Sequence, residues 1–391
     1  MLERRKPLDL LIPLKGGASN NLGVKKDGIT AAERLRAAVN LTADAVKAVS
    51  LTAMEALREG AAFIGIVGEQ DELLDPFQHL DAPIWARDPP VELLKLAYSY
   101  CEELTMREAG NFYHSFKYLP EEQRLAMCAV YAFCRRADDI ADGDWQDRFP
   151  GSQGEMDPEA VAYRNELENL QKKDTILQED LYLEKITQLF FFRKKLSTCY
   201  STTSSTDPVF LALKDTVNRY NIPRNVFDDL ITGMEDDLYN NRYRTFDELY
   251  LYCYRVASVV GLMCIEIYGY EDVRAKKFAE SWGIFMQLTN VLRDVGEDIQ
   301  RNRVYLPLDE LESNGIIEKE LNGDVVLNSS WEPYVHHYAK RARTYLDEAK
   351  QLLPLLPRRT RYSPAAMIAF YDKILKQIER QQGDILSLIH I

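Results

Sequence analysis

Apolar residues recur every three or four positions over most of the chain, and this spacing predicts amphipathic α-helices. No run of alternating apolar and polar residues indicates a β-strand between them. We therefore predict an all-α fold. The predicted helical segments are 31–65, which holds one or two helices, 120–142, 159–198, a helix opened by Pro223, 245–268, 273–300, 331–353 and 364–386.

Proline, glycine and small polar residues mark the breaks between these segments. Residues 1–29 are expected to form a flexible arm, several prolines from 76 to 90 indicate an irregular linker, and loops are predicted at 143–158 and 201–208. We expect residues 1–93 to form an N-terminal extension that serves packing or oligomerisation in preference to attachment to a membrane or a pathway partner. Residues 94–391 are expected to form one large domain.

Two predicted helices each carry a pair of aspartates four residues apart, Asp138 with Asp142 and Asp294 with Asp298. Because a spacing of four returns to the same helix face, each pair forms a carboxylate patch that is unfavourable without a cation. Further polar residues extend both patches in the same register. The two stripes are Tyr131, Arg135, Asp138 and Asp142, and Gln287, Asn290, Asp294 and Asp298.

Polar stripes on otherwise apolar helices indicate the lining of a wet, charged cavity. The alternative is a solvent-facing edge with salt bridges from residues such as Arg136, Arg293 and Arg301. Two stripes of matching register favour the cavity. Facing aspartate patches suit Mg²⁺, which binds one or two carboxylates and completes its shell with waters and phosphate oxygens, so they point to diphosphate ionisation. The sequence has no EF-hand loop, zinc-binding His motif or CxxC pair.

Longer motifs around the stripes resemble those of the squalene and phytoene synthase family. The two signature segments are 131–142 and 287–298, and RVYLP follows the second at 303–307. Supporting matches are NFY at 111–113, GMEDD at 233–237 and YCYRVA at 252–257. The resemblance extends from about residue 94 to about residue 383. Motifs of this length and order are far more specific than a lone DxxxD.

The resemblance implies a single large helical bundle of the isoprenoid synthase type, with a central cavity and an N-terminal helical extension. It also implies a Mg²⁺-dependent transferase that joins two prenyl diphosphates head to head. The implied metal ligands are Asp138, Asp142, Asp294 and Asp298. The implied substrate-binding residues are Tyr131, Arg135, Gln287, Asn290 and Arg303, and the implied catalytic residues are Tyr254, Tyr371 and Arg135.

Structural alternatives exist for some of these residues. Arg135 could pair with an aspartate one helical turn away, and Tyr254 and Tyr371 could be buried packing residues with satisfied hydroxyls. Asn111 stands where the family often has Ser, so it receives no catalytic role.

The length of the prenyl chains depends on the finer features of the motifs. Segments 111–113, 255–262 and 266–270 look closer to squalene-forming members that use farnesyl diphosphate, whereas segment 241–249 and Gly296 look closer to phytoene synthases that use geranylgeranyl diphosphate. We favour farnesyl diphosphate, with geranylgeranyl diphosphate as the alternative. NADPH would serve as reductant if the product is squalene. A non-catalytic scaffold of the family is the alternative of another class, but all four motif aspartates are present.

The composition limits partners and location. With 61 acidic and 48 basic side chains the formal net charge is −13, which argues against nucleic-acid binding and against a strongly basic membrane-docking surface. Six scattered Cys indicate reduced thiols. No run of roughly 18 consecutive apolar residues and no secretory signal core is found. We expect a cytoplasmic protein, with peripheral membrane association as a route for delivering an apolar product.

Overall fold

Helices make up most of the residues that the computed structural model describes, which are 91–143, 180–202, 204–205, 207–318, 321 and 330–380. No β-strand occurs in these ranges, so the all-α prediction is confirmed. The elements are α3 (Val91–Glu108), α4 (Gly110–Phe116), α5 (Glu121–Asp142), α7 (Asp180–Cys199), α8 (Pro208–Tyr220), α9 (Arg224–Tyr239), α10 (Phe246–Cys253), the π-helix η2 (Tyr254–Ser258), α11 (Val259–Tyr268), α12 (Arg274–Gln300), α13 (Leu308–Ser313), α14 (Trp331–Lys350), the 3₁₀ helix η4 (Leu353–Leu355) and α15 (Tyr362–Arg380).

Some predicted segments fall elsewhere or outside these ranges. The N-terminal extension up to residue 90, most of the 143–158 loop, the first part (159–179) of the predicted helix 159–198 and the helix end at 381–386 lie outside the described residues. The predicted helix 245–268 is divided into α10, η2 and α11. The sequence did not predict α3, α4 or α8. Pro208 indicated a break, but a proline also suits the first turn of a helix, and the Asp207 carboxylate caps α8 by accepting from the Val209 N–H.

Helix α5 carries the first acidic motif, and its ends follow from the local sequence. Pro120 precedes it, and two glutamates in its first turn favour the positive end of the helix. At the other end Gly143 adopts a left-handed conformation with φ of 84°, and its N–H donates to the Asp139 and Ile140 carbonyls. Glycine adopts this geometry without a Cβ clash, so α5 stops directly after Asp142.

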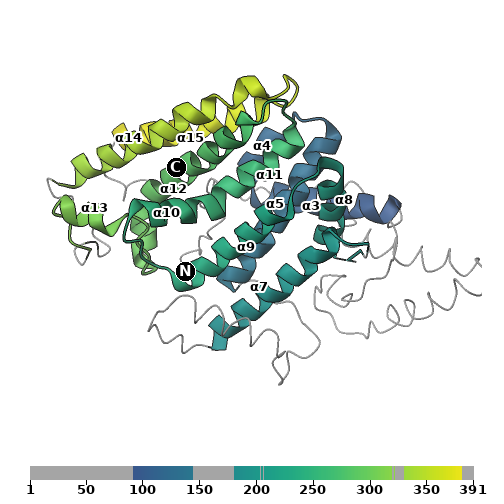
Figure 1. Cartoon of the computed structure of the whole chain (residues 1–391), viewed down its shortest axis with the longest axis horizontal. Coiled ribbons are helices and arrows are strands. Elements are labelled where there is room, and N and C mark those ends of the chain that lie inside the picture. The colour runs from purple at the N-terminus through teal and green to yellow at the C-terminus, as the bar shows by residue number, and fades with distance from the viewer. Residues whose placement is uncertain are drawn as a thin grey trace, which may run out of the picture.

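The two motif helices occupy central positions in the bundle (Figure 1). Helix α5 packs against α3, α7, α8, α9 and α11, while α12 packs against α10, η2, α11, α14 and α15. On one side of α5 the Phe133 ring contacts the rings of Phe192, Phe210 and Phe227, with centroids 4.7, 6.0 and 5.1 Å away. This aromatic cluster fixes α5 to its neighbours and leaves another face of the helix for the site.

The π-helix η2 lies unusually close to α12. A Cβ built on Gly283 would come within 2.4 Å of the Ser258 Cα, and one built on Gly261, in the following helix α11, would come within 2.7 Å of the Ala279 carbonyl oxygen. The Ser258 hydroxyl donates to the Glu280 carbonyl at 2.9 Å. Glycine is therefore required where the two backbones meet, and the tight contact holds the π turn in place.

Candidate active site

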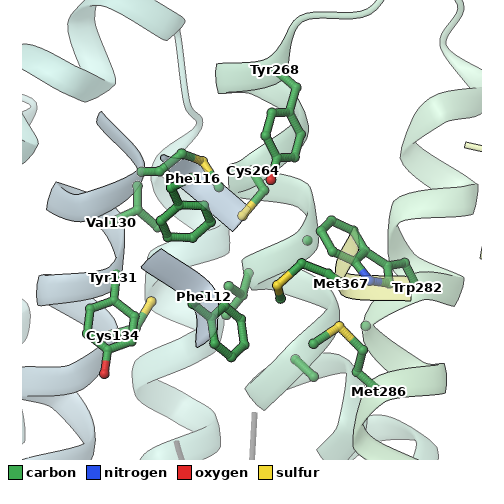
Figure 2. Close-up of a pocket in the computed structure, with 15 residues that line it drawn as sticks. Phe112, Phe116, Val130, Tyr131, Cys134, Cys264, Tyr268, Trp282, Met286 and Met367 are labelled. Carbon is green, nitrogen blue, oxygen red and sulfur yellow. The ribbon is translucent and has the colours of Figure 1, made fainter. Parts of the chain in front are cut away.

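An apolar cavity lies inside the bundle, between the two helices that carry the acidic motifs. It encloses about 640 Å³ of empty space, part of which is open to solvent. Its walls come from α4, α5, η2, α11, α12 and α15 (Figure 2). The lining residues are Phe112, Phe116, Met127, Val130, Tyr131, Cys134, Ala257, Val260, Gly261, Cys264, Tyr268, Trp282, Gly283, Met286 and Met367. The predicted central cavity is present, and its walls suit a hydrocarbon chain.

The cavity wall on α5 continues directly into the first acidic stripe. Met127, Tyr131 and Cys134 line the cavity, and the next positions on the same face are Asp138 and Asp142. At a rise of about 1.5 Å per residue, Asp142 lies roughly 12 Å beyond Cys134 along the helix. One face of α5 is thus apolar in its first part and acidic in its last turns.

Helix α12 repeats the same arrangement. Gly283 and Met286 line the cavity, and Asn290, Asp294 and Asp298 follow on that side. Both helices therefore run from the apolar wall toward the carboxylates. The result is an elongated compartment, apolar along its length and acidic at one end.

The first acidic stripe contains a buried guanidinium group. Asp138 is fully buried and Asp142 is partly buried. The Arg135 Nε lies 3.2 Å from the Asp139 carboxylate, one turn away, and its Nη2 lies 3.8 Å from the Glu108 carboxylate. The structural alternative for Arg135 is therefore observed as a contact. Two acids orient this cation at the edge of the stripe.

The second stripe contains a closely bound ion pair. Arg293 donates from Nε and Nη2 to the two oxygens of Asp294, at 2.8 and 2.6 Å, and both side chains are buried. Tyr371 is fully buried on α15, and it hydrogen-bonds Arg293. Burial raises the pKa of Tyr371, while Arg293 opposes that change. Tyr371 therefore supports the ion pair and is not part of the apolar cavity lining.

Asp298, unlike Asp294, forms no ion pair with another described residue. Burial and the neighbouring Asp294 raise the pKa of Asp298 well above its usual range, although Arg303 and Arg301 oppose the change. Its Oδ2 accepts no hydrogen bond from the described residues. Beside it the buried Asn290 amide donates to Gln287 at 3.3 Å, which leaves the Asn290 Oδ1 without a hydrogen bond there. These oxygens are poorly satisfied by the protein alone.

Arg303 links the two stripes electrostatically. Its pKa is raised first by Tyr305 and then by Asp237, with a further contribution from Asp142, while burial opposes the change. Because Arg303 also lowers the pKa of Asp298, it lies close enough to influence the last aspartate of both stripes. The two motifs thus converge on the same cation.

The sequence analysis gave no role to the buried carboxylate of Asp237, which lies near Arg303. The hydroxyls of Tyr252 and Tyr305 each donate to Asp237 at 3.2 Å. Burial raises the pKa of Asp237 to about 6, against the opposing effects of Arg303 and the two hydroxyls. The Tyr243 ring stacks with Tyr305 at a centroid distance of 5.8 Å and packs at a tilt against Tyr252 at 5.2 Å. The GMEDD, YCYRVA and RVYLP motifs were the available signals, since each contributes a member of this cluster.

Tyr254 lies apart from these groups. It is half-buried at the start of η2 and is not among the residues that line the cavity. Burial raises its pKa, and Asp229 and Glu280 raise it further. On a helix a residue two positions away points to nearly the opposite side, so Tyr252 and not Tyr254 faces the Asp237 cluster.

The residues present fit a hard cation whose coordination shell is mostly water and phosphate oxygens, with few protein ligands. No three His, Cys, Asp or Glu side chains converge as a ready-made metal site in the part of the chain that the structure describes. The carboxylates are instead spread over two helices, and the buried Asp298 Oδ2 has no hydrogen bond from the described residues. Mg²⁺ suits such a donor set, because it binds through one or two carboxylates together with water and phosphate oxygens.

Comparison with known proteins gives a consistent result. The family model described as "Squalene/phytoene synthase" matches residues 105–390. The chain is 34% identical over 307 residues to chloroplastic phytoene synthase 1 of Zea mays, a match that covers 77% of this chain and 66% of that protein. It is 32% identical to 15-cis-phytoene synthase of Synechococcus elongatus, covering 75% of this chain and 87% of that protein. A crystal structure of a dehydrosqualene synthase in complex with ligand superposes with a TM-score of 0.61 at 26% identity, covering 75% of this chain and 90% of that one.

Proposed function

Because this chain belongs to the squalene/phytoene synthase family, we propose that it is a transferase that joins two prenyl diphosphates head to head. The observation that carries the proposal is the compartment whose apolar wall continues, on the same faces of α5 and α12, into two acidic stripes. Such a compartment matches a substrate with a long hydrocarbon chain and a multiply charged head.

The acidic end would hold the diphosphate groups through metal ions. Asp138, Asp142, Asp294 and Asp298 would bind Mg²⁺, which stabilises the charge of a departing diphosphate when bound. Arg303 would donate to diphosphate oxygens, since it is the cation that both stripes share.

The apolar end would hold the prenyl chains and protect reactive carbon centres. The rings of Phe112, Tyr131 and Trp282 line the wall, and an aromatic face attracts positive charge without acting as a nucleophile. The same walls exclude water, which would otherwise capture an allylic cation. Arg135 would complete the polar rim at the point where the wall becomes acidic.

The sequence motifs and the relatives point to prenyl chains of different length. The motifs favour farnesyl diphosphate, whereas the curated relatives are phytoene synthases and so favour the geranylgeranyl alternative. We propose geranylgeranyl diphosphate as the first substrate to test, with farnesyl diphosphate as the second. NADPH would be consumed only if the product is squalene.

Purified protein with Mg²⁺ should be incubated with each diphosphate, with and without NADPH, and the products identified by mass spectrometry. We expect a head-to-head product from one substrate. Asp138→Ala and Asp294→Ala are expected to abolish turnover with helical content retained. No product from either substrate would favour the non-catalytic scaffold.

Asp298→Asn gives a sharper test, because it removes one of two repelling buried carboxylates without changing the shape of the side chain. We expect it to abolish turnover while leaving the protein at least as stable at neutral pH. Glu297→Gln is the matched control, since Glu297 is half-buried on the same helix and pairs with Arg301. Normal turnover by Asp298→Asn would contradict the metal-binding role.

We propose a cytoplasmic location with peripheral membrane association. One helical stretch, Phe246–Tyr268, is long and apolar enough to cross a bilayer, but 61% of its window is buried inside the bundle. We interpret it as a core helix. Within the described residues, contact with a membrane would then involve the surface of the folded domain.

A further inference from the structure

Two tyrosines stand exposed side by side at one end of the bundle. Tyr118 follows α4 and is 66% exposed, and Tyr362 begins α15 and is 57% exposed. Their rings meet edge to face with centroids 5.2 Å apart. Exposed tyrosines that pack mainly on each other leave most of two aromatic faces in contact with solvent.

This tyrosine pair lies next to the apolar end of the cavity, away from the aspartates. Phe116, two residues before Tyr118, lines the cavity. Next to Tyr362, the Ser363 hydroxyl lies 2.9 Å from that of the cavity residue Tyr268, and it donates to Ser115 at 3.3 Å. Figure 2 shows Phe116 and Tyr268 together at one end, with Tyr131 and Met286 toward the other. Short local contacts therefore connect the outer tyrosines to the cavity wall.

Three exposed cations lie around the pair, although the whole chain carries a net charge of −13, and two exposed acids, Glu121 and Glu122, follow Tyr118 in sequence. Lys117, Arg358 and Arg359 are exposed beside the two tyrosines in sequence. No ion pair joins these three cations to an acid within the described ranges. The sequence from 349 to 371 contains no Asp or Glu at all. Of the two nearby acids, Glu122 is paired with Arg219 at 3.2 Å, so the three cations outnumber the remaining acid, Glu121, in this region.

The loop that carries these cations is held in place. Arg361 donates to the carbonyls of Pro354 and Leu356, at 3.1 and 2.7 Å, and Thr360 donates to the Tyr268 carbonyl at 3.1 Å. Figure 1 shows the connection between α14 and α15 at the same end of the bundle as α4. The tyrosines and cations therefore form one fixed surface.

We propose that this surface, consisting of Lys117, Tyr118, Arg358, Arg359 and Tyr362, docks the protein peripherally on an anionic lipid bilayer. Tyrosine prefers the headgroup level of a membrane, and exposed basic residues add roughly 1 kcal/mol each near an anionic leaflet. The charge complementarity and the small aromatic area suit lipid headgroups, whereas a stable protein interface needs a larger packed surface. Docking here directs the apolar end of the cavity toward the hydrocarbon. In this orientation apolar chains could pass between the cavity and the membrane. This purpose rests on the proposed function, whereas the docking itself does not.

Flotation of the full chain with lipid vesicles tests the proposal. We expect binding to vesicles of phosphatidylcholine with phosphatidylglycerol, weakening as salt is raised, and little binding to phosphatidylcholine alone. Arg358→Glu/Arg359→Glu should weaken the partition coefficient by about a hundredfold, and Tyr118→Ser/Tyr362→Ser by about tenfold. Lys340→Glu/Lys373→Glu is the matched control, because it makes the same charge change at exposed positions on α14 and α15.

The expected control result is binding close to that of the unchanged protein. The proposal would be overturned if the protein bound neutral and anionic vesicles equally or bound neither. It would also be overturned if the control lost as much binding as the docking variants. Measuring turnover with detergent-dispersed substrate distinguishes a role in membrane docking from a role in the reaction. Turnover should be unchanged in all three variants, and its complete absence from the unchanged protein would refute the proposed function without touching the docking result.

Discussion

The Arg293 guanidinium binds both oxygens of the adjacent Asp294 carboxylate inside the protein, at 2.8 and 2.6 Å. A carboxylate expected to bind metal is thus neutralised by the protein's own cation. Removal of one partner of a buried pair leaves the other charge uncompensated, which typically costs about 3–5 kcal/mol.

We expect Arg293→Met to lower the free energy of unfolding by about 3 kcal/mol or more in metal-free buffer, and Mg²⁺ to restore part of the loss by binding the released carboxylate. Urea denaturation with and without Mg²⁺ measures both effects. Arg301→Met is the control, since its partner Glu297 is half-buried and the pair is worth less than about 1 kcal/mol. Equal losses in the two variants would contradict this account of the pair.

The close approach of α12 to η2 gives a second prediction. A methyl group at Gly283 would meet the Ser258 backbone at 2.4 Å, whereas one at Gly110 meets no atom within 4 Å. Gly283→Ala should therefore destabilise the protein by about 3 kcal/mol or more. Gly110→Ala should be neutral or stabilising by up to about 1 kcal/mol, because alanine favours the helix. Thermal and urea unfolding of both variants would check this, and a harmless Gly283→Ala would show that the helices can separate freely.

Asp237 makes stability depend on pH. Its pKa is raised from 3.8 to about 6 by burial, so the folded protein holds this proton more tightly than the unfolded chain does. Its contribution is fully present below about pH 4 and is lost as the pH rises to about 6. Relative to the unchanged protein, Asp237→Asn should therefore gain stability across this window, by up to about 3 kcal/mol. Urea unfolding at several pH values measures the difference, and a difference that stays constant from pH 4 to 7 would contradict the raised pKa.

The end of the cavity beside Tyr268 should limit prenyl chain length. Cys264 lines the wall one helical turn before Tyr268. Under the proposed function, Cys264→Phe should lower kcat/KM for geranylgeranyl diphosphate relative to farnesyl diphosphate by about tenfold or more, because it fills the space for the last isoprene unit. Cys264→Val is the control of similar volume and should keep the ratio. An unchanged ratio in Cys264→Phe would mean that the chain lies elsewhere.

Much of the site's register could be predicted from the sequence, because helix periodicity is a local property. A spacing of four places Asp138 with Asp142 on one face in any α-helix, and the apolar residues before them predicted the cavity wall. The sequence named Arg293 as a candidate salt-bridge partner at a solvent-facing edge, but it could not predict that the pair with Asp294 is buried and that Tyr371, from a helix distant in sequence, hydrogen-bonds it. Only tertiary packing brings that hydroxyl to the guanidinium.

The choice between two tyrosines shows another limit. Tyr252 and Tyr254 belong to the same apolar segment, and composition does not distinguish them. The rotation of α10 against α9 turns Tyr252 to the buried Asp237 and leaves Tyr254 half-buried near Asp229. The π turn that follows is enforced by contact with Gly283, a residue on another helix. Rotation about a helix axis is fixed by such neighbours and not by the period of the sequence.

The common direction of α5 and α12 has a consequence for the affinity of the acidic end. Helix α5 ends at Asp142 and α12 ends at Gln300, two residues after Asp298, so both stripes lie at the carboxyl ends of their helices. Aligned peptide dipoles place roughly half a negative charge at such an end. The partial negative charge of these two helix ends thus adds to the field of the aspartates, even though Gly143 and Arg301 donate to carbonyls of the last turns. A cation approaching the acidic end meets two helix termini that already attract it, and replacing every motif aspartate with asparagine would weaken that attraction without removing it.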